Sequence, residues 1–160
     1  MKQFLFLMVF LPVFIITSCS SDEDNGIQYS EKQQKILDVF HGSFRYDNKL
    51  GNVTIWSEII EFTEQYPKPK IFTHEDYLND EVQGAEVHGK CFYTNSLGDR
   101  ESKFYYISTD GTTVKLYGDK DNKPYWMSNK YILKVTDVNS FTLLDTKLSL
   151  LATCYFQRIN

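Results

Sequence analysis

The sequence lacks the short motifs that mark the commonest enzyme classes. Its 160 residues contain no Gly-x-Ser-x-Gly nucleophile elbow, no phosphate-binding loop and no glycine fingerprint for a dinucleotide. Only three cysteines and three histidines occur, and none of them has the paired spacing of a zinc site. We therefore expect a protein that is not an enzyme and that carries no cofactor.

An excess of positive charge is also missing. The chain has 17 Lys and Arg against 21 Asp and Glu, which gives a formal net charge of −4 at pH 7. Nucleic acids and anionic lipid surfaces attract proteins with clustered basic side chains. Because no such cluster occurs here, we expect no nucleic-acid partner.

Acidic residues cluster in two places without forming a recognisable site. His74-Glu75-Asp76 with Asp80 and Glu81 is the densest group of metal-binding residue types. Its spacing matches neither a calcium loop nor a His-Glu-x-x-His zinc motif, so we interpret it as a solvated loop without a metal. Glu58 and Glu61 lie three apart on an expected strand and should face opposite sides of the sheet.

The first 18 residues have the features of a secretory signal peptide. Lys2 is followed by the uncharged, apolar run from Phe4 to Ile16. This run is about 13 residues long, whereas a helix needs about 20 to span a bilayer. The pattern predicts a signal peptide over residues 1–18.

The end of that run, Ile16-Thr17-Ser18-Cys19, resembles the lipobox of bacterial lipoproteins. The resemblance implies that the Cys19 thiol takes a diacylglycerol and that the chain is cut before this residue. It also implies that the new amino terminus is often acylated, with a fatty acid such as palmitate. Two or more acyl chains anchor a protein stably, so the expected partner of this end is a membrane.

Residues 19–28 should form a flexible acidic tether. The stretch from Ser20 to Gly26 is polar and has no large apolar side chain. An acidic stretch after the lipidated cysteine also resembles the signal that sends Bacteroidota lipoproteins to the outer face of the outer membrane. A plain linker that leaves the protein facing the periplasm is the alternative.

Residues 29–160 are expected to form one domain that is rich in β-structure. Aromatic residues make up 16% of the chain, and such residues favour strands. A short helix is expected near residues 30–40, because Ser30 and Gln33 fit a capping box and Gly42 follows. The apolar residues of this helix that recur at helical spacing are Ile36, Leu37 and Phe40.

The rest of the domain consists of some eight or nine short strands separated by turns. Asp110-Gly111 is the strongest hairpin signal. Residues 47–52 and 137–140 are expected turns, 66–69 and 118–124 expected loops, and 74–86 a long loop that can include one helical turn. The expected strand segments are 43–46, 53–62, 87–94, 103–108, 114–117, 125–127, 131–135, 141–144 and 150–159, with a short one at 71–73.

This order of elements predicts an antiparallel up-and-down meander that closes into a lipocalin-like barrel of about eight strands. A two-sheet β-sandwich is the alternative. The short helix, the opening Gly42-Ser43-Phe44 and the meander resemble the small lipocalin-like lipoproteins of Bacteroidota. The chain departs from the lipocalin pattern at Phe44, which stands where a Gly-x-Trp motif would have tryptophan.

Two cysteines remain in the expected domain, Cys91 and Cys154, and both fall within expected strands. A compartment outside the cytoplasm permits a disulfide. Free cysteine is also among the residues most often buried. The sequence therefore leaves two alternatives, a Cys91–Cys154 disulfide or two buried thiols.

Four aromatic residues are candidates for contact with a ligand or partner: Trp56, Tyr106, Tyr125 and Trp126. Tyr125-Trp126 is the best surface candidate because it follows a charged segment. We expect a lipid-anchored, non-catalytic binding protein of the outer membrane or cell surface that holds a small apolar or amphipathic ligand in its barrel. The alternative is an accessory or structural envelope protein whose filled barrel contacts a protein or a glycan.

Overall fold

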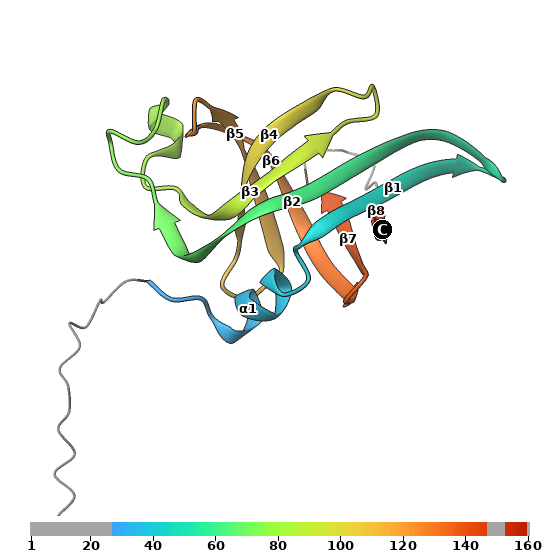
Figure 1. Cartoon of the computed structure of the whole chain (residues 1–160), viewed down its shortest axis with the longest axis horizontal. Coiled ribbons are helices and arrows are strands. Elements are labelled where there is room, and N and C mark those ends of the chain that lie inside the picture. The colour runs from blue at the N-terminus through green and yellow to red at the C-terminus, as the bar shows by residue number, and fades with distance from the viewer. Residues whose placement is uncertain (1–26, 147–152, 160) are drawn as a thin grey trace, which may run out of the picture.

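The computed structural model describes residues 27–146 and 153–159. Eight antiparallel strands follow one another around a closed barrel, in which β8 pairs with β1 (Figure 1). The predicted all-β barrel is confirmed, rather than the two-sheet sandwich. The predicted signal peptide and Cys19 lie outside the described residues. The strands are β1 (Gly42–Leu50), β2 (Val53–Ile71), β3 (Glu86–Thr94), β4 (Arg100–Ile107), β5 (Thr113–Lys120), β6 (Lys123–Asp137), β7 (Ser140–Asp145) and β8 (Thr153–Ile159).

Helix α1 (Glu31–Leu37) begins with the predicted capping box. The Gln33 N–H donates to Ser30 Oγ (3.1 Å), and the Ser30 N–H donates to Gln33 Oε1 (2.8 Å). The buried Gln33 side chain also donates from Nε2 to the carbonyl oxygen of Ile107 (2.9 Å), at the end of β4. The same glutamine therefore starts the helix and fixes it to the barrel. The helix ends at Leu37, earlier than predicted, and the chain enters β1 at Gly42, where φ is +77°.

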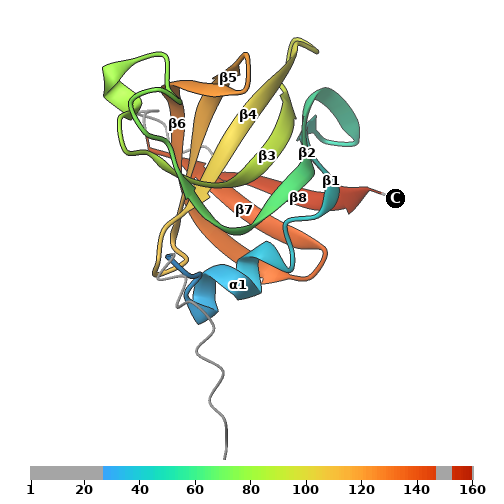
Figure 2. The ribbon, with the colours of Figure 1, turned by 60° about the vertical axis from the view of Figure 1, so that its left-hand side comes forward.

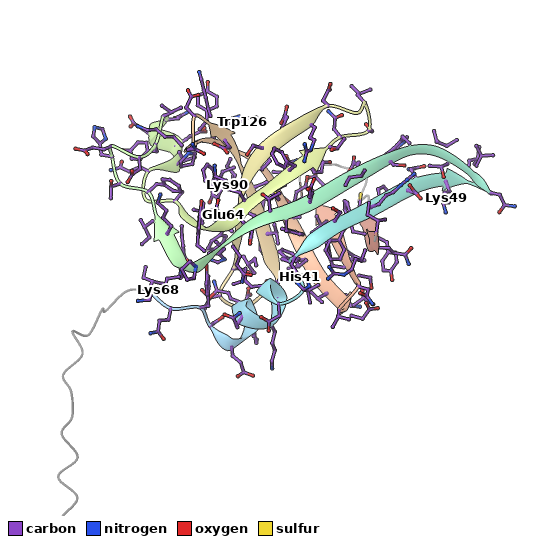
Figure 3. All side chains as sticks on the ribbon, viewed as in Figure 1. His41, Lys49, Glu64, Lys68, Lys90 and Trp126 are labelled. Carbon is purple, nitrogen blue, oxygen red and sulfur yellow. The ribbon has the colours of Figure 1, made fainter. Side chains whose placement is uncertain are left out.

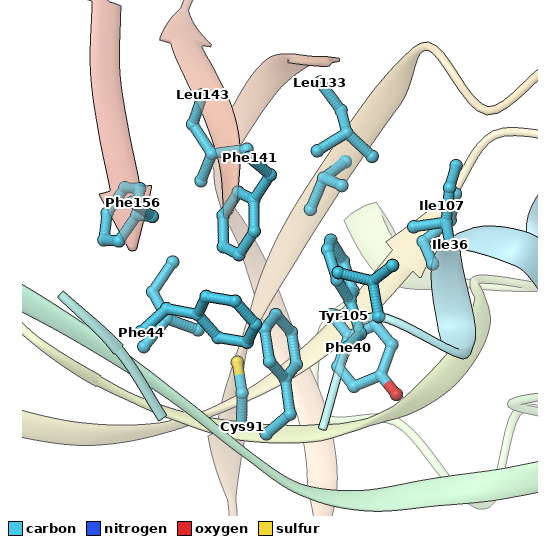
Figure 4. Packing of buried hydrophobic residues seen from close by; sticks show 14 of the residues in the cluster. Ile36, Phe40, Phe44, Cys91, Tyr105, Ile107, Leu133, Phe141, Leu143 and Phe156 are labelled. Atoms are coloured by element: carbon cyan, nitrogen blue, oxygen red, sulfur yellow. The ribbon is translucent and has the colours of Figure 1, made fainter. Parts of the chain in front are cut away.

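The barrel interior at the α1 end is packed with phenylalanine rings. Phe40 stacks on Phe62 with ring centroids 4.2 Å apart, and Phe141 stacks on Phe156 at 5.3 Å. Phe44 lies 4.9 Å from Phe141. Figure 4 shows these side chains converging from several strands, and Figure 2 shows α1 lying across this end of the barrel. This end is closed by a buried aromatic core.

Two segments that were expected to connect strands, one as a turn and one as a loop, belong mostly to strands in the structure. The predicted turn over 47–52 shrinks to Gly51-Asn52, and the predicted loop over 118–124 shrinks to a turn at Asp121-Asn122. Asp121 and Asn122 have φ values of 55° and 62°, which suit a tight two-residue hairpin. Lys120 and Lys123 stand opposite each other on either side of this turn. The strands pair through their backbones, so the pairing does not depend on the charge of the side chains. The predicted Asp110-Gly111 hairpin is confirmed between β4 and β5.

The predicted loop over 66–69 is also wrong, because β2 continues through both prolines. Gln65 pairs with Gly89 and Lys70 pairs with Val87, so residues 66–69 stand opposite the single residue His88. The prolines therefore occupy an irregularity where no ladder N–H is needed. The expected strands 125–127 and 131–135 likewise join into β6, with the register shift falling near Ser128.

The long loop between β2 and β3, here called the cover loop (residues 72–85), folds over the outside of the barrel. It contains the predicted helical turn, a 3-10 helix η1 (Asp80–Val82). The Leu78 N–H donates to the Pro124 carbonyl (3.2 Å), so the loop reaches the β5–β6 hairpin. A second, smaller core forms beneath it from Phe72, Tyr77, Val82, Val87, Phe104 and Tyr117.

Candidate functional site

The interior of the barrel away from α1 contains polar side chains among aromatic ones. The five residues concerned lie on β2, β3, β6, β7 and β8, each two positions along its strand from a core residue. They therefore face the same side of the sheet as the core, the interior. Together with Trp56 on β2 they are called here the polar end of the barrel. The five are Glu58, Tyr93, Tyr131, Asp145 and Cys154.

Strand pairing brings the members of the polar end together. Glu58 stands opposite Tyr46 in the β1–β2 ladder, and Tyr131 stands opposite Asp145 in the β6–β7 ladder. The half-buried Trp56 makes an edge contact with Tyr46, with ring centroids 5.4 Å apart. The sequence candidate Trp56 is thus placed in the interior, on the same face of β2 as Glu58 and beside the Tyr46 phenol.

Burial dominates the electrostatics of the polar end. It raises the pKa of the Glu58 carboxyl, and the negative charge of Asp145 raises it further, while a hydrogen bond with Tyr93 acts in the opposite direction. Burial also raises the pKa values of the Tyr93 and Tyr131 hydroxyls. These groups can offer hydrogen bonds at neutral pH, but no tyrosine here is poised to ionise.

Both cysteines of the domain are free thiols in the structure. Cys91 is 1% exposed in the aromatic core, and burial raises its pKa to about 12. Cys154 is half-buried, and burial with the nearby charges of Glu58 and Asp145 raises its pKa to about 11. A thiol with so high a pKa is a poor nucleophile at neutral pH.

Glu58 and Glu61 face opposite sides of the sheet, as predicted. Glu58 lies at the polar end, whereas the carboxylate of Glu61 forms an ion pair with Arg100 (2.7 Å) on the outside of the barrel. The two carboxyl groups therefore do not converge on a common substrate position.

Tyr106 lies outside the barrel, beneath the cover loop. It borders a recess of about 400 Å³ together with Tyr117, Met127 and Glu86. The Lys115 ammonium sits 5.1 Å from the centre of the Tyr106 ring. This sequence candidate therefore shares no site with Trp56.

Tyr125 and Trp126 project from β6 next to the β5–β6 hairpin, 42% and 43% exposed. Figure 3 shows Trp126 near the β5–β6 end of the molecule, away from His41 beside α1. Both rings border a recess of about 340 Å³. The four aromatic candidates thus fall in three separate places, and only Tyr125 and Trp126 lie together.

His88 and Asp76 of the acidic loop have structural partners. The Ile107 N–H donates to His88 Nδ1 (3.2 Å), which puts the proton on Nε2, 2.8 Å from Glu86 Oε1. Burial lowers the pKa of His88, so the buried imidazole is neutral. In the acidic loop, Asp76 accepts hydrogen bonds from Thr73. Within residues 27–146 and 153–159, no group of three or more His, Cys, Asp or Glu is placed to hold a metal ion.

No protein-family model, curated protein or solved structure matches this chain. Within the described residues, no helix combines the length and apolar character needed to cross a membrane. The class of the protein therefore follows from its architecture. It is a small, closed, up-and-down β-barrel of eight strands with an N-terminal helix, compatible with a lipocalin-like fold.

Proposed function

We propose that this chain is a lipid-anchored binding protein of the outer membrane, facing the cell surface, whose barrel holds a small amphipathic ligand at its polar end. The division of the barrel interior carries this proposal. The α1 end is filled with phenylalanine, whereas the opposite end combines half-buried aromatic rings with hydroxyl and carboxyl groups. Ligand sites commonly combine apolar walls with a few polar groups that set orientation.

The expected binding mode follows from the positions of these groups. The apolar part of a ligand would pack on Trp56 and Tyr46, which contact each other edge to face. Its polar part would meet Glu58 and the Tyr93 and Tyr131 hydroxyls. Binding of this kind holds and orients a molecule without changing its covalent structure.

The position of helix α1 supports the proposed orientation on the membrane. The described chain begins at Ile27, directly before α1, at the closed end of the barrel. A membrane anchor at Cys19 would therefore hold the barrel by its closed end. The polar end would point away from the lipid surface, toward ligands arriving from outside.

Native mass spectrometry of the mature protein, extracted from membranes in mild detergent, tests the binding function. We expect an added mass that disappears on denaturation and that is lost in Trp56→Ala. Tyr155→Ala, an exposed aromatic on β8, is the control and should keep the added mass. A clean apo mass, repeated after incubation with envelope lipids, would overturn the proposal.

The anchor is tested separately by detergent-phase partitioning. The wild type and Cys154→Ser should enter the detergent phase, and Cys19→Ser should stay in the aqueous phase. Protease digestion of intact cells then distinguishes a surface-exposed barrel from one that faces the periplasm. Partitioning of Cys19→Ser into detergent would contradict the lipid anchor.

An accessory envelope protein that contacts a protein or glycan is the second candidate. The packed α1 end and the exposed Tyr125 and Trp126 favour it, because these aromatic rings lie outside the filled part of the barrel. In that case the mass spectrum shows no small ligand, and the binding surface is on the outside.

A further inference from the structure

A recess beside the β5–β6 hairpin has the features of a second binding site, which shares no residue with the polar end although its Glu101 stands opposite Tyr93 in the β3–β4 ladder. Its volume is about 340 Å³, and residues of β4, β5 and β6 line it. We call it the rim recess. The side chains that border it are Glu101, Ser102, Lys103, Asp119, Tyr125 and Trp126.

One wall of the rim recess is aromatic and partly exposed. Tyr125 and Trp126 are consecutive residues with 42% and 43% of their surfaces accessible. Gly118 on β5 lets the indole pack closely, because a Cβ there would come within 3.0 Å of Trp126 Nε1. The ring is therefore held against β5 while part of its surface remains open to a ligand.

A buried carboxylate in the same recess has an unused hydrogen-bonding atom. The Asp119 side chain is only 8% exposed, and its Oδ2 accepts from Lys90 Nζ (2.8 Å) and Ser102 Oγ (2.6 Å). Its Oδ1 is buried and has no hydrogen-bond partner among the described residues. Buried acceptors in proteins nearly always have a donor, so Asp119 Oδ1 has the capacity to accept one further hydrogen bond.

The charged side chains that line the rim recess are paired, and one further cation, the Lys120 ammonium, lies 5.6 Å from the centre of the Tyr125 ring. Lys103 Nζ lies 2.5 Å from Glu101 Oε2, and Lys90 neutralises Asp119. Because the lining charges are paired, the lining itself offers no unpaired charge to an ionic ligand. Its two remaining properties are flat aromatic surfaces and an acceptor for a hydroxyl or amide hydrogen.

These properties match the chemistry of a sugar ring, which has an apolar C–H face and a rim of hydroxyl donors. We infer that the rim recess binds a neutral saccharide, with one sugar ring packed on Trp126 and Tyr125 and a hydroxyl donating to Asp119 Oδ1. The site does not depend on the ligand proposed for the barrel interior, because it uses none of the same residues.

Calorimetric titration of the mature protein in mild detergent tests this site. The probes are neutral hexasaccharides of β-1,4-linked glucose, β-1,4-linked N-acetylglucosamine, β-1,4-linked xylose and α-linked mannose, with hexagalacturonate as the charged comparison. At least one neutral probe should bind, and Trp126→Ala should weaken that binding by about tenfold or more, as expected for an aromatic residue central to a contact. Asp119→Asn should also weaken saccharide binding, because an NH2 group of the asparagine amide replaces one of the two acceptor oxygens of the carboxylate.

Tyr125→Ala and Tyr155→Ala form the matched pair for this test, since the two tyrosines are 42% and 41% exposed on different strands. Only the first should weaken binding. The inference is overturned if no neutral probe binds, if hexagalacturonate binds best, or if Trp126→Ala binds as tightly as the wild type.

Tryptophan fluorescence gives a second measurement that does not depend on the folding of Trp126→Ala. The chain has two tryptophans, so Trp56→Phe leaves Trp126 as the only indole. The bound saccharide should change the emission of this variant in proportion to occupancy. Unchanged emission at a saturating concentration of a probe that binds would place the saccharide elsewhere and overturn the inference.

Discussion

The two ends of this barrel are built differently although the same strands form both. At the α1 end, rings from the segment after α1 and from four strands pack into a buried core. At the polar end, the same interior face carries Glu58, two tyrosines, Asp145 and a thiol. The comparison indicates that one half supplies most of the hydrophobic stabilisation, which allows the other half to hold polar groups at some energetic cost.

The closed end is also tied together by a cation from the last strand. The Arg158 guanidinium donates to the carbonyls of Val39 (3.1 Å), Val138 (2.8 Å) and His41, and it lies 4.6 Å from the Phe44 ring centre. It therefore joins the segment after α1 to the β6–β7 turn. Both termini of the domain contribute to closing the same end of the barrel.

The largest expected difference between the ends is in stability. Phe141→Ala should lower the free energy of unfolding by about 3–5 kcal/mol, because the ring is fully buried among other phenylalanines. Trp56→Ala at the polar end should have a clearly smaller effect, since that ring is only half-buried. Urea denaturation measures both. Equal losses would show that the two ends contribute equally to stability.

The attachment of α1 should have the next largest effect. Gln33→Ala removes half of the capping box and leaves the Ile107 carbonyl without its partner, at an expected cost of about 1–3 kcal/mol. Gln34→Ala is the control, because that side chain is exposed and bonds only within the helix. If the two variants have the same stability, the helix does not hold the closed end through Gln33.

At the polar end, Glu58→Gln should increase stability at neutral pH. The pKa of Glu58 is raised above its ordinary value of 4.5 in the folded protein, so the folded state holds its proton more tightly than the unfolded chain. The free energy of unfolding therefore falls as the pH rises above about 4.5. The gain from the substitution should be present at pH 7 and smaller at pH 4 in thermal unfolding. Glu61→Gln, on the outer face, is the control and should show no gain, and a loss of stability in Glu58→Gln at pH 7 would contradict the expectation.

The smallest effect is a difference in thiol reactivity. In a Cys19→Ser background, both remaining thiols should react slowly with a disulfide reagent at pH 7.5, because their pKa values of about 11 and 12 lie far above their ordinary value of 9.0. The half-buried Cys154 should react before the buried Cys91, and Cys154→Ser isolates the slower phase. Both should react quickly in urea. Faster labelling of Cys91 in the folded protein would contradict the packing of the core.

Local signals in the sequence predicted local structure well. The capping box of Ser30 and Gln33 and the Asp110-Gly111 turn depend on residues that are close in the chain, and both are present. The same reasoning was wrong at residues 66–69 and 118–124, where charge and proline indicated loops. There the pairing with a neighbouring strand decides the backbone, and that neighbour cannot be read from the segment itself.

The candidate site was predictable only as a set of residue types. The sequence identified aromatic residues, but it could not say that Trp56 faces the interior, that Tyr106 lies under the cover loop, or that Trp126 lies at the rim recess. Glu58 was considered only as a partner of Glu61, which faces the other side of the sheet, and Asp119 was missed as a functional candidate. The residues next to a carboxylate in the sequence do not reveal which side chains will lie beside it on the neighbouring strands.

The sequence by itself thus determined the all-β class, the helix start and the tight turns, because these follow from backbone dihedral preferences and from hydrogen bonds between near neighbours. The tertiary structure alone decided how far each strand extends, which end of the barrel is filled, and which carboxylates are buried. Those features depend on contacts between residues distant in the chain, which form only when β8 closes on β1 and the cover loop folds back over the outer wall.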